Sequence, residues 1–234
     1  MLRSPTPSQI PGLIPYDKIR RMRALLLVLL TSMLLFGCAL PAIAAPTSRP
    51  PSGTVLYKDD FSSPVSGWDH TKYAEGIMDY DGGGYRMLVN AVDLNFWSSP
   101  HKNFTDVRVE VDAGKLGGPD ENRIGLICRS NGTNYYFLIV SSDGYYGLGL
   151  FKDGLATLLD QEQMVASTAI RKGLAINHLR LDCNGDSLSG FVNGFELAQV
   201  HDATLKSGEV GLLAGTFKQP GADIVFDNFV VFAP

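Results

Sequence analysis

Five residues lie on the polar faces of two segments in which polar and apolar side chains alternate: Glu110, Asp112, His178, Arg180 and Asp182. Carboxylates and imidazoles are common general acids and bases, and guanidinium groups donate hydrogen bonds to sugar hydroxyls. His178 and Arg180 are therefore candidate ligand-binding residues. A solvated strand face would produce the same pattern, so the sequence leaves both explanations open.

A pair of aromatic residues suggests a second kind of site. Tyr145 and Phe151 fall on one face of a predicted strand, where only two glycines separate them. Such glycines leave a shallow trough in which a ligand can approach the sheet, and aromatic rings line many small-molecule sites. Arg123 and Arg129 are expected on the polar side of a neighbouring strand and complete this candidate sugar site. Alternatively, the glycines relieve crowding and the aromatic rings pack beneath loops.

Cys128 and Cys183 each share a strand face with apolar neighbours. In a protein outside the cytoplasm, two such cysteines are expected to form a disulfide. Closing a loop of about 55 residues would stabilise the fold by about 4 kcal/mol in the chain-entropy model. Two buried, unpaired thiols are the alternative.

The elements that hold these residues are predicted to be short antiparallel strands. Of the 181 residues from Thr54 onward, 22 are glycine, and turn-forming Asp-Gly or Asn-Gly pairs recur at residues 143–144, 153–154, 184–185 and 193–194. Alternation with period two indicates sheets with one wet face, whereas residues 135–140 are apolar on both faces, as in a central strand. We expect about a dozen strands, with one short helix around residues 161–166. The fold class is therefore all-β, a two-sheet antiparallel jelly-roll sandwich over residues 54–234. Trp68 and Trp97 are expected in its core, with sugar stacking as the alternative.

The first 53 residues have a different composition. A basic cluster at residues 18–23 precedes the apolar run 24–36, which is the layout of a secretory signal. Residues 1–38 are therefore expected to be a signal peptide whose lipobox-like end places Cys38 as a lipidation site. Cleavage after Ala44 and a retained membrane anchor are the alternatives. Residues 39–53, rich in Pro, Ser and Thr, are expected to be a tether. The domain is thus expected on the outer side of the cell membrane or secreted.

The body of the chain is acidic. Residues 54–234 contain 14 basic and 23 acidic residues, a formal net charge of −9. A nucleic-acid-binding surface is normally basic, so nucleic acid is not expected as a partner.

The order of the segments resembles a known family. DDFSSPVSGW at the start, FVNG in a hairpin, GEVGL and the closing FDNF are similar to concanavalin A-like jelly rolls of the laminarinase and laminin-G type. The nearest match is the group of 3-keto-disaccharide hydrolase domains, which includes secreted bacterial versions. The resemblance covers nearly all of residues 55–232 and implies a jelly-roll fold with a carbohydrate ligand in a secreted bacterial lipoprotein.

The resemblance does not carry a catalytic motif onto this sequence. Laminarinase-type enzymes use an E-x-D-x-E pattern, and here Glu110 and Asp112 are followed by Gly114. Glycoside hydrolysis normally needs two carboxyl groups, and residues 134–142 contain none. We therefore expect a non-catalytic carbohydrate- or glycoconjugate-binding module. A hydrolase of the 3-keto-disaccharide type and a protein-binding adhesion domain are the alternatives.

A structural calcium ion is a further expectation. Asp accounts for 17 of the 23 acidic residues in the body, and related sandwiches bind Ca²⁺ where their chain ends meet. Asp60 and Asp227 are the candidate ligands, with Asp59 and Asp223 close in the sequence. The four histidines show no zinc-ligand spacing. Ordinary aspartate turns explain the same residues without a metal.

Overall fold

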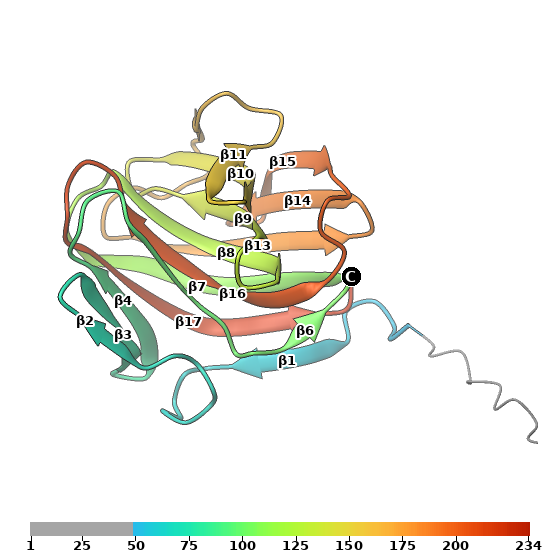
Figure 1. The fold of residues 1–234 in the computed structure, drawn as a ribbon, viewed down its shortest axis with the longest axis horizontal. Helices are drawn as coiled ribbons and strands as arrows, with labels where there is room; N and C mark the ends of the chain where they lie inside the picture. The colour runs from blue at the N-terminus through green and yellow to red at the C-terminus, as the bar shows by residue number, and fades with distance from the viewer. Residues whose placement is uncertain (1–48) are drawn as a thin grey trace, which may run out of the picture. The chain divides into compact units, whose positions relative to one another are not determined.

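The computed structural model describes residues 49–234, of which Pro50–Pro234 form one compact unit (Figure 1). The predicted signal peptide 1–38, its Cys38 and most of the predicted tether lie outside the described residues. No helix in the described part of the chain is long and apolar enough to cross a membrane.

Two antiparallel sheets form the domain. The nine-stranded sheet has the order β15 (Phe195–His201), β14 (Ser187–Val192), β13 (Ile176–Asn184), β7 (Val107–Gly117), β17 (Ala222–Phe232), β4 (Gly84–Val89), β3 (Gly76–Asp81) and β2 (Thr71–Tyr73), with β1 (Val55–Asp59) also paired to β17. The eight-stranded sheet has the order β11 (Leu155–Leu158), β10 (Tyr145–Lys152), β9 (Tyr135–Val140), β8 (Asn122–Ser130), β16 (Gly208–Thr216) and β5 (Asn95–Ser98), with β12 (Val165–Ala166) paired to β10 and β6 (Asn103–Phe104) to β16. The predicted all-β, two-sheet antiparallel sandwich is confirmed, with more strands than the dozen expected because several are only two to four residues long.

The core lies between the sheets, as the alternating sequence predicts. On β7, Val107, Val109 and Val111 are buried, and on β13 Leu179 and Leu181 are buried opposite them. β9 is buried along its whole length because both faces are covered: Tyr136, Leu138 and Val140 face the core, while Tyr135, Phe137 and Ile139 belong to a second apolar cluster. Trp68 is 3% exposed and lies in the main core.

A disulfide joins the two sheets. Cys128 on β8 of the eight-stranded sheet bonds to Cys183 on β13 of the nine-stranded sheet. The predicted pairing is confirmed. Disulfides persist in oxidising compartments, so this bond is typical of a protein outside the cytoplasm.

Asp-Gly and Asn-Gly pairs make tight hairpins. Asp153 and Gly154 between β10 and β11, and Asn193 and Gly194 between β14 and β15, all have positive φ angles. Two consecutive positive φ angles define the turn that matches the natural twist of a hairpin, and these residue types adopt them at low cost. These turns fix which faces of β10 and β14 point outward.

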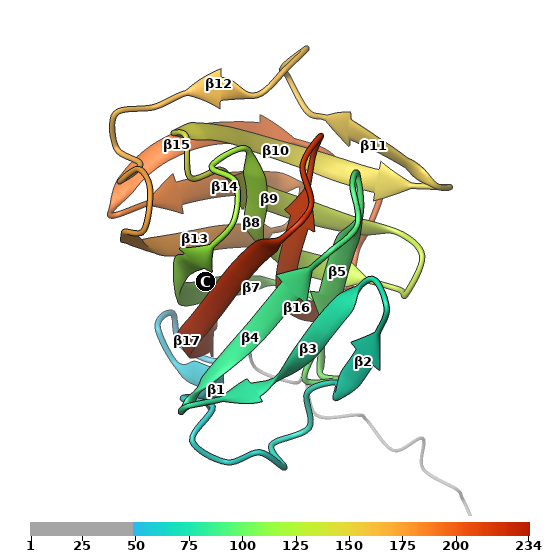
Figure 2. The same ribbon diagram turned by 90° about the vertical axis from the view of Figure 1, so that its left-hand side faces the viewer.

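The helix expected around residues 161–166 is not formed. Val165 and Ala166 are the short strand β12, and Leu159 donates its backbone N–H to the carbonyl of Leu148 at 2.8 Å. This segment is held against the edge of the sheet because it can hydrogen bond to β10, which outweighs a weak local helix preference. Figure 2 shows β11 and β12 running beside β10.

Candidate functional site

The outer face of the eight-stranded sheet carries an apolar cluster separate from the core. Its buried members are Ile127, Tyr135, Phe137, Ile139 and Leu213, and the partly buried side chains packed against them are Trp97, Phe151, Leu158 and Met164. Strands β8, β9 and β16 supply the floor, and the segment containing Leu158 and Met164 covers part of it. A sheet face that carries this many aromatic and aliphatic side chains and is only partly covered is typical of a binding surface.

A cavity of about 390 Å³ opens in this cluster. Its lining includes the aromatic rings of Tyr135, Phe137, Phe151 and Phe217, together with Arg123. This volume lies at the lower end of the range for small-molecule sites, about 300–1,000 Å³. The cavity is therefore large enough for a small ligand in contact with several aromatic rings.

Arg123 is held rigidly in the cavity wall. Its Nη1 donates to Asn95 Oδ1 at 2.9 Å and its Nη2 to Asp93 Oδ1 at 2.8 Å. The guanidinium carbon lies 4.0 Å from the centre of the Phe217 ring, so a cation–π contact fixes the plane of the group. Two of the five N–H donors of Arg123 are engaged in these bonds, which leaves others for a ligand.

The aromatic floor is equally well fixed. Tyr135 and Phe151 stack with ring centres 5.0 Å apart and planes at 13°. Burial raises the pKa of the Tyr135 phenol, and the nearby positive charge of Arg123 lowers it by less. The hydroxyl therefore stays protonated at neutral pH and can both donate and accept a hydrogen bond.

The predicted trough along β10 is partly filled. Tyr145 and Phe151 do lie on the outer face, because Tyr146, Leu148 and Leu150 pack into the core. Above the two intervening glycines lie side chains rather than open space: Leu158 and Met164 sit over Gly147, and the Phe137 ring sits over Gly149. Gly147 and Gly149 thus relieve crowding, which is the alternative explanation given for them above. The cavity of about 390 Å³ lies beside these glycines and not over them. Tyr145, 41% exposed, lies outside the cavity lining.

Arg129 is not available to a ligand. Its side chain is 1% exposed and donates to the carbonyls of Thr105 and Leu205, each at 2.9 Å, and to Asp106 Oδ1 at 3.0 Å. Arg129 has a positive φ angle. The pairing of β8 with β16 shifts register near this residue, so the regular inward–outward alternation of side chains is interrupted there. The structure therefore removes Arg129 from the candidate site and gives it a structural role.

His178 and Arg180 lie on the outer face of the nine-stranded sheet, on the other side of the sandwich from the cavity. His178 Nδ1 lies 2.8 Å from Asp112 Oδ1, and Arg180 Nε donates to Asp182 Oδ1 at 2.8 Å. The Arg180 guanidinium also lies 4.3 Å from the centre of the Phe191 ring. These residues form a network of surface ion pairs and do not join Arg123 in one site.

The aspartates expected to bind calcium accept hydrogen bonds from neighbouring protein groups. Asp60 Oδ1 accepts hydrogen bonds from the backbone N–H and hydroxyl of Ser62, and these bonds lower the pKa of Asp60. Asp59 accepts from the indole of Trp68 at 2.9 Å, and Asp227 accepts from the N–H of Asn228 at 2.7 Å. Within residues 49–234, no group of three or more His, Cys, Asp or Glu side chains is placed to hold a metal ion.

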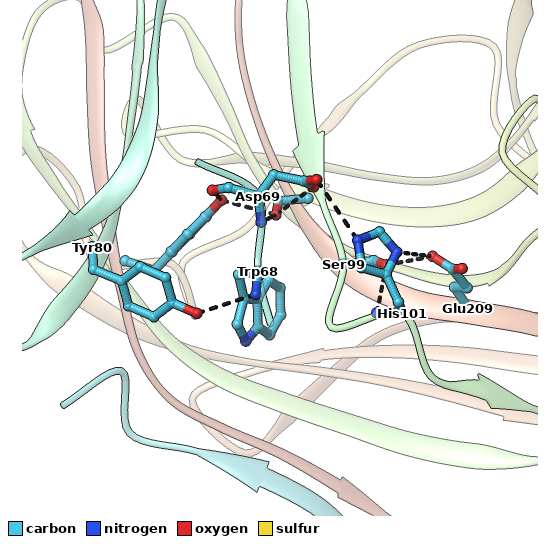
Figure 3. Close-up of polar contacts among 8 residues, drawn as sticks. Trp68, Asp69, Tyr80, Ser99, His101 and Glu209 are labelled. Atoms are coloured by element: carbon cyan, nitrogen blue, oxygen red, sulfur yellow. Dashed lines mark hydrogen bonds and ion pairs between the residues drawn. The ribbon is translucent and has the colours of Figure 1, made fainter. Parts of the chain in front are cut away.

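A second polar cluster was not expected from the sequence. Figure 3 shows His101 between two carboxylates: its Nε2 lies 3.7 Å from Asp69 Oδ1 and its Nδ1 lies 3.4 Å from Glu209 Oε2. Ser99 also donates to Glu209, but its side chain is fully buried, so it is not an accessible nucleophile. The cluster joins the loop after β1 to the start of β16. Its members are far apart in sequence and have no motif spacing that would reveal them.

Sequence reasoning identified only Arg123 and Phe151 in the cavity wall and missed, among others, Asp93, Asn95, Met164 and Phe217. Asp93, Asn95 and Phe217 meet Arg123 because β16 lies between β5 and β8, an order that the sequence does not reveal. The alternation in residues 95–98 could have revealed part of this wall, because it places Asn95 and Trp97 on the same face of the strand. Trp97 packs against the outer cluster and not in the main core, contrary to the expectation.

No protein-family model matches the chain, and no curated protein sequence does. Solved structures do match. A protein of unknown function with a galectin-like fold from Bacillus subtilis is 15% identical over 78% of this chain and 97% of its own, with a TM-score of 0.60. The domain is a galectin-like, concanavalin A-like sandwich.

Two further structures share the fold and have glycan-related names. One, described with endo-acting O-glycanases that members of the human gut microbiota express to initiate mucin breakdown, is 10% identical over 77% of this chain and 99% of its own, with a TM-score of 0.54. The other, an endo-β-galactosidase from Clostridium perfringens that releases GlcNAcα1-4Gal, is 8% identical over 81% of this chain and 64% of its own, with a TM-score of 0.55. At these identities the likeness concerns the fold alone.

Proposed function

We propose that this domain is a carbohydrate- or glycoconjugate-binding module whose site is the cavity on the outer face of the eight-stranded sheet. The observation that carries the proposal is the pairing of a rigid guanidinium, Arg123, with the stacked rings of Tyr135 and Phe151 in a cavity of about 390 Å³. Aromatic faces pack against the C–H faces of sugar rings, and fixed polar groups orient the hydroxyls. The glycan-related names of two neighbours with this fold support the same ligand class.

Binding of the purified domain to a glycan panel tests this proposal. The Arg123→Met variant should lose binding because it removes the fixed donor and the charge that holds Asp93 and Asn95 in place. Arg171→Met is the matched control, because it also removes one positive charge, while the Arg171 side chain donates to the carbonyl of Ile176 at the start of β13 and is not part of the cavity lining. Equal binding by both variants would contradict the proposed site.

Hydrolysis of a modified disaccharide, as the 3-keto-disaccharide hydrolase resemblance implies, is the second candidate. Carboxylates do line this side of the molecule: Asp93 borders the cavity, and Glu121 and the half-buried Asp143 border an adjoining hollow. Asp93 is paired with Arg123 and Asp143 with Ser141, which leaves Glu121 as the carboxylate best placed for proton transfer. Release of a shortened sugar from the panel, abolished in Glu121→Gln, would favour the hydrolase. Binding without product would favour the module.

We also propose that the domain is exported and held at the membrane by a lipid on Cys38. The disulfide supports an extracytoplasmic location, and the lipobox-like sequence before Cys38 supports the anchor. Mass spectrometry of the mature N-terminus tests the anchor directly. An unmodified N-terminus at Ala45 would show simple secretion instead.

A further inference from the structure

A second hollow of about 240 Å³ adjoins the cavity. Its lining includes Glu121 and Asp143, the half-exposed Tyr145, and Lys218. Met164 and Phe217 line both spaces, so the two hollows meet at these side chains. The outer face of the eight-stranded sheet therefore carries one groove with two compartments.

The two compartments have different walls. The first is mainly apolar, with four aromatic rings, and contains Arg123, whereas the second has one exposed ring, Tyr145, among charged side chains. Tyr145 and Phe151 lie six residues apart on the same face of β10, which corresponds to about 20 Å along a strand. A single sugar ring cannot contact both residues, but a short chain of sugars can.

The charges along the groove are nearly balanced. Asp93, Glu121 and Asp143 supply three carboxylates, and Arg123 and Lys218 supply two cations. Asp93 is already paired with Arg123 at 2.8 Å. An anionic sugar would meet more negative than positive charge, whereas neutral hydroxyls can bond to both kinds of group.

We propose that the groove binds a neutral oligosaccharide of at least two units, with one unit in the Arg123 cavity and the next against Tyr145. This inference rests on the proposed function and adds the length and charge of the ligand. The Met164 side chain, which is flexible and polarizable, adapts to the link between the two units. Phe217 is held against the Arg123 guanidinium and lines both compartments at the junction.

Calorimetric titration with neutral sugars of increasing length tests the inference. The probes are glucose, galactose and their β-linked di-, tri- and tetrasaccharides, together with a uronic-acid disaccharide. We expect the affinity to rise at least tenfold from one unit to two or three. Tyr145→Ala should then lower the affinity for the longer probes about tenfold, the equivalent of one buried aromatic contact, and leave the single sugar unchanged.

Tyr73→Ala is the matched control, because Tyr73 is an exposed tyrosine on β2 of the other sheet. Equal affinity for one unit and for longer chains, or a Tyr145→Ala variant that binds like Tyr73→Ala, would overturn the second compartment. Tighter binding of the uronic-acid disaccharide would overturn the neutral ligand. In these cases loss of binding in Arg123→Met would still support the proposed function, whereas no binding of any probe would contradict that function itself.

Discussion

Two arginines on the same strand have opposite roles, and the difference lies in their burial. Arg129 donates to two carbonyls and a carboxylate inside the protein, whereas Arg123 pairs with the exposed Asp93 at the cavity rim. Removing one partner of a buried network leaves the others unsatisfied, which is costly, whereas Asp93, the carboxylate partner of Arg123, is 81% exposed and can be solvated when the pair is broken.

We therefore predict that Arg129→Met lowers the free energy of unfolding by about 3 kcal/mol, and that Arg123→Met lowers it by less than about 1 kcal/mol. Urea denaturation of both variants measures the difference. Similar losses in the two variants would contradict the separation of a structural from a ligand-binding arginine.

Tyr57 is one of several tyrosines with raised pKa values, and it makes the fold sensitive to alkali. Burial, the charge of Asp59 and a hydrogen bond to Asp59 at 3.2 Å raise the pKa of Tyr57 to about 12. The unfolded chain loses this proton near its ordinary value of about 10, so ionisation favours the unfolded state between these values. Stability that is fully present below pH 10 should thus decline as the pH rises toward 12. Denaturation at pH 9 and pH 11.5 should show a smaller decline in Tyr57→Phe than in the unaltered protein.

At the scale of elements, β10 fits its surroundings only with glycine at position 149. A Cβ atom there would lie 2.3 Å from Phe137 Cζ and 2.6 Å from the carbonyl oxygen of Thr157. The Phe137 ring lines the cavity, so its displacement would change that space, and the carbonyl belongs to β11, which is paired to this strand. Gly149→Ala should therefore destabilise the domain by about 1–3 kcal/mol and narrow the cavity.

Gly117→Ala is the control for this substitution. Gly117 lies on β7, has no positive φ, and its added Cβ would meet nothing closer than Asp223 Cβ at 4.0 Å. Thermal melting should leave this variant close to the unaltered protein. A Gly149→Ala variant that melts at the same temperature as the unaltered protein would contradict the predicted steric clash at position 149.

Local pattern predicted the elements better than it predicted the site. The inward faces of β7 and β13 follow from alternation alone, because each side chain needs only its own strand to choose a direction, and the unbroken apolar run predicts that β9 is covered on both faces. The cavity needed the order of five strands, in which β16 lies between β5 and β8. For that reason Arg123 and Phe151 were identified, while Asp93 and Phe217, which complete the wall, were not.

At the scale of the molecule, the Cys128–Cys183 bond holds the two sheets together across 55 residues of sequence. Closing such a loop restricts the unfolded chain, so the bond should stabilise the domain by about 4 kcal/mol in the chain-entropy model. We expect the Cys128→Ala, Cys183→Ala double variant to show this loss in denaturation, with the fold retained in its circular dichroism spectrum. A double variant as stable as the native protein would show that packing alone holds the sheets together.

The central claim is that the outer face of the eight-stranded sheet binds sugar through Arg123 and its aromatic neighbours. The most direct measurement is the affinity of the unaltered domain, Arg123→Met and Arg171→Met for the same neutral oligosaccharide. Binding should be retained in Arg171→Met and lost in Arg123→Met, with both variants folded. Full binding by a folded Arg123→Met variant would contradict the claim.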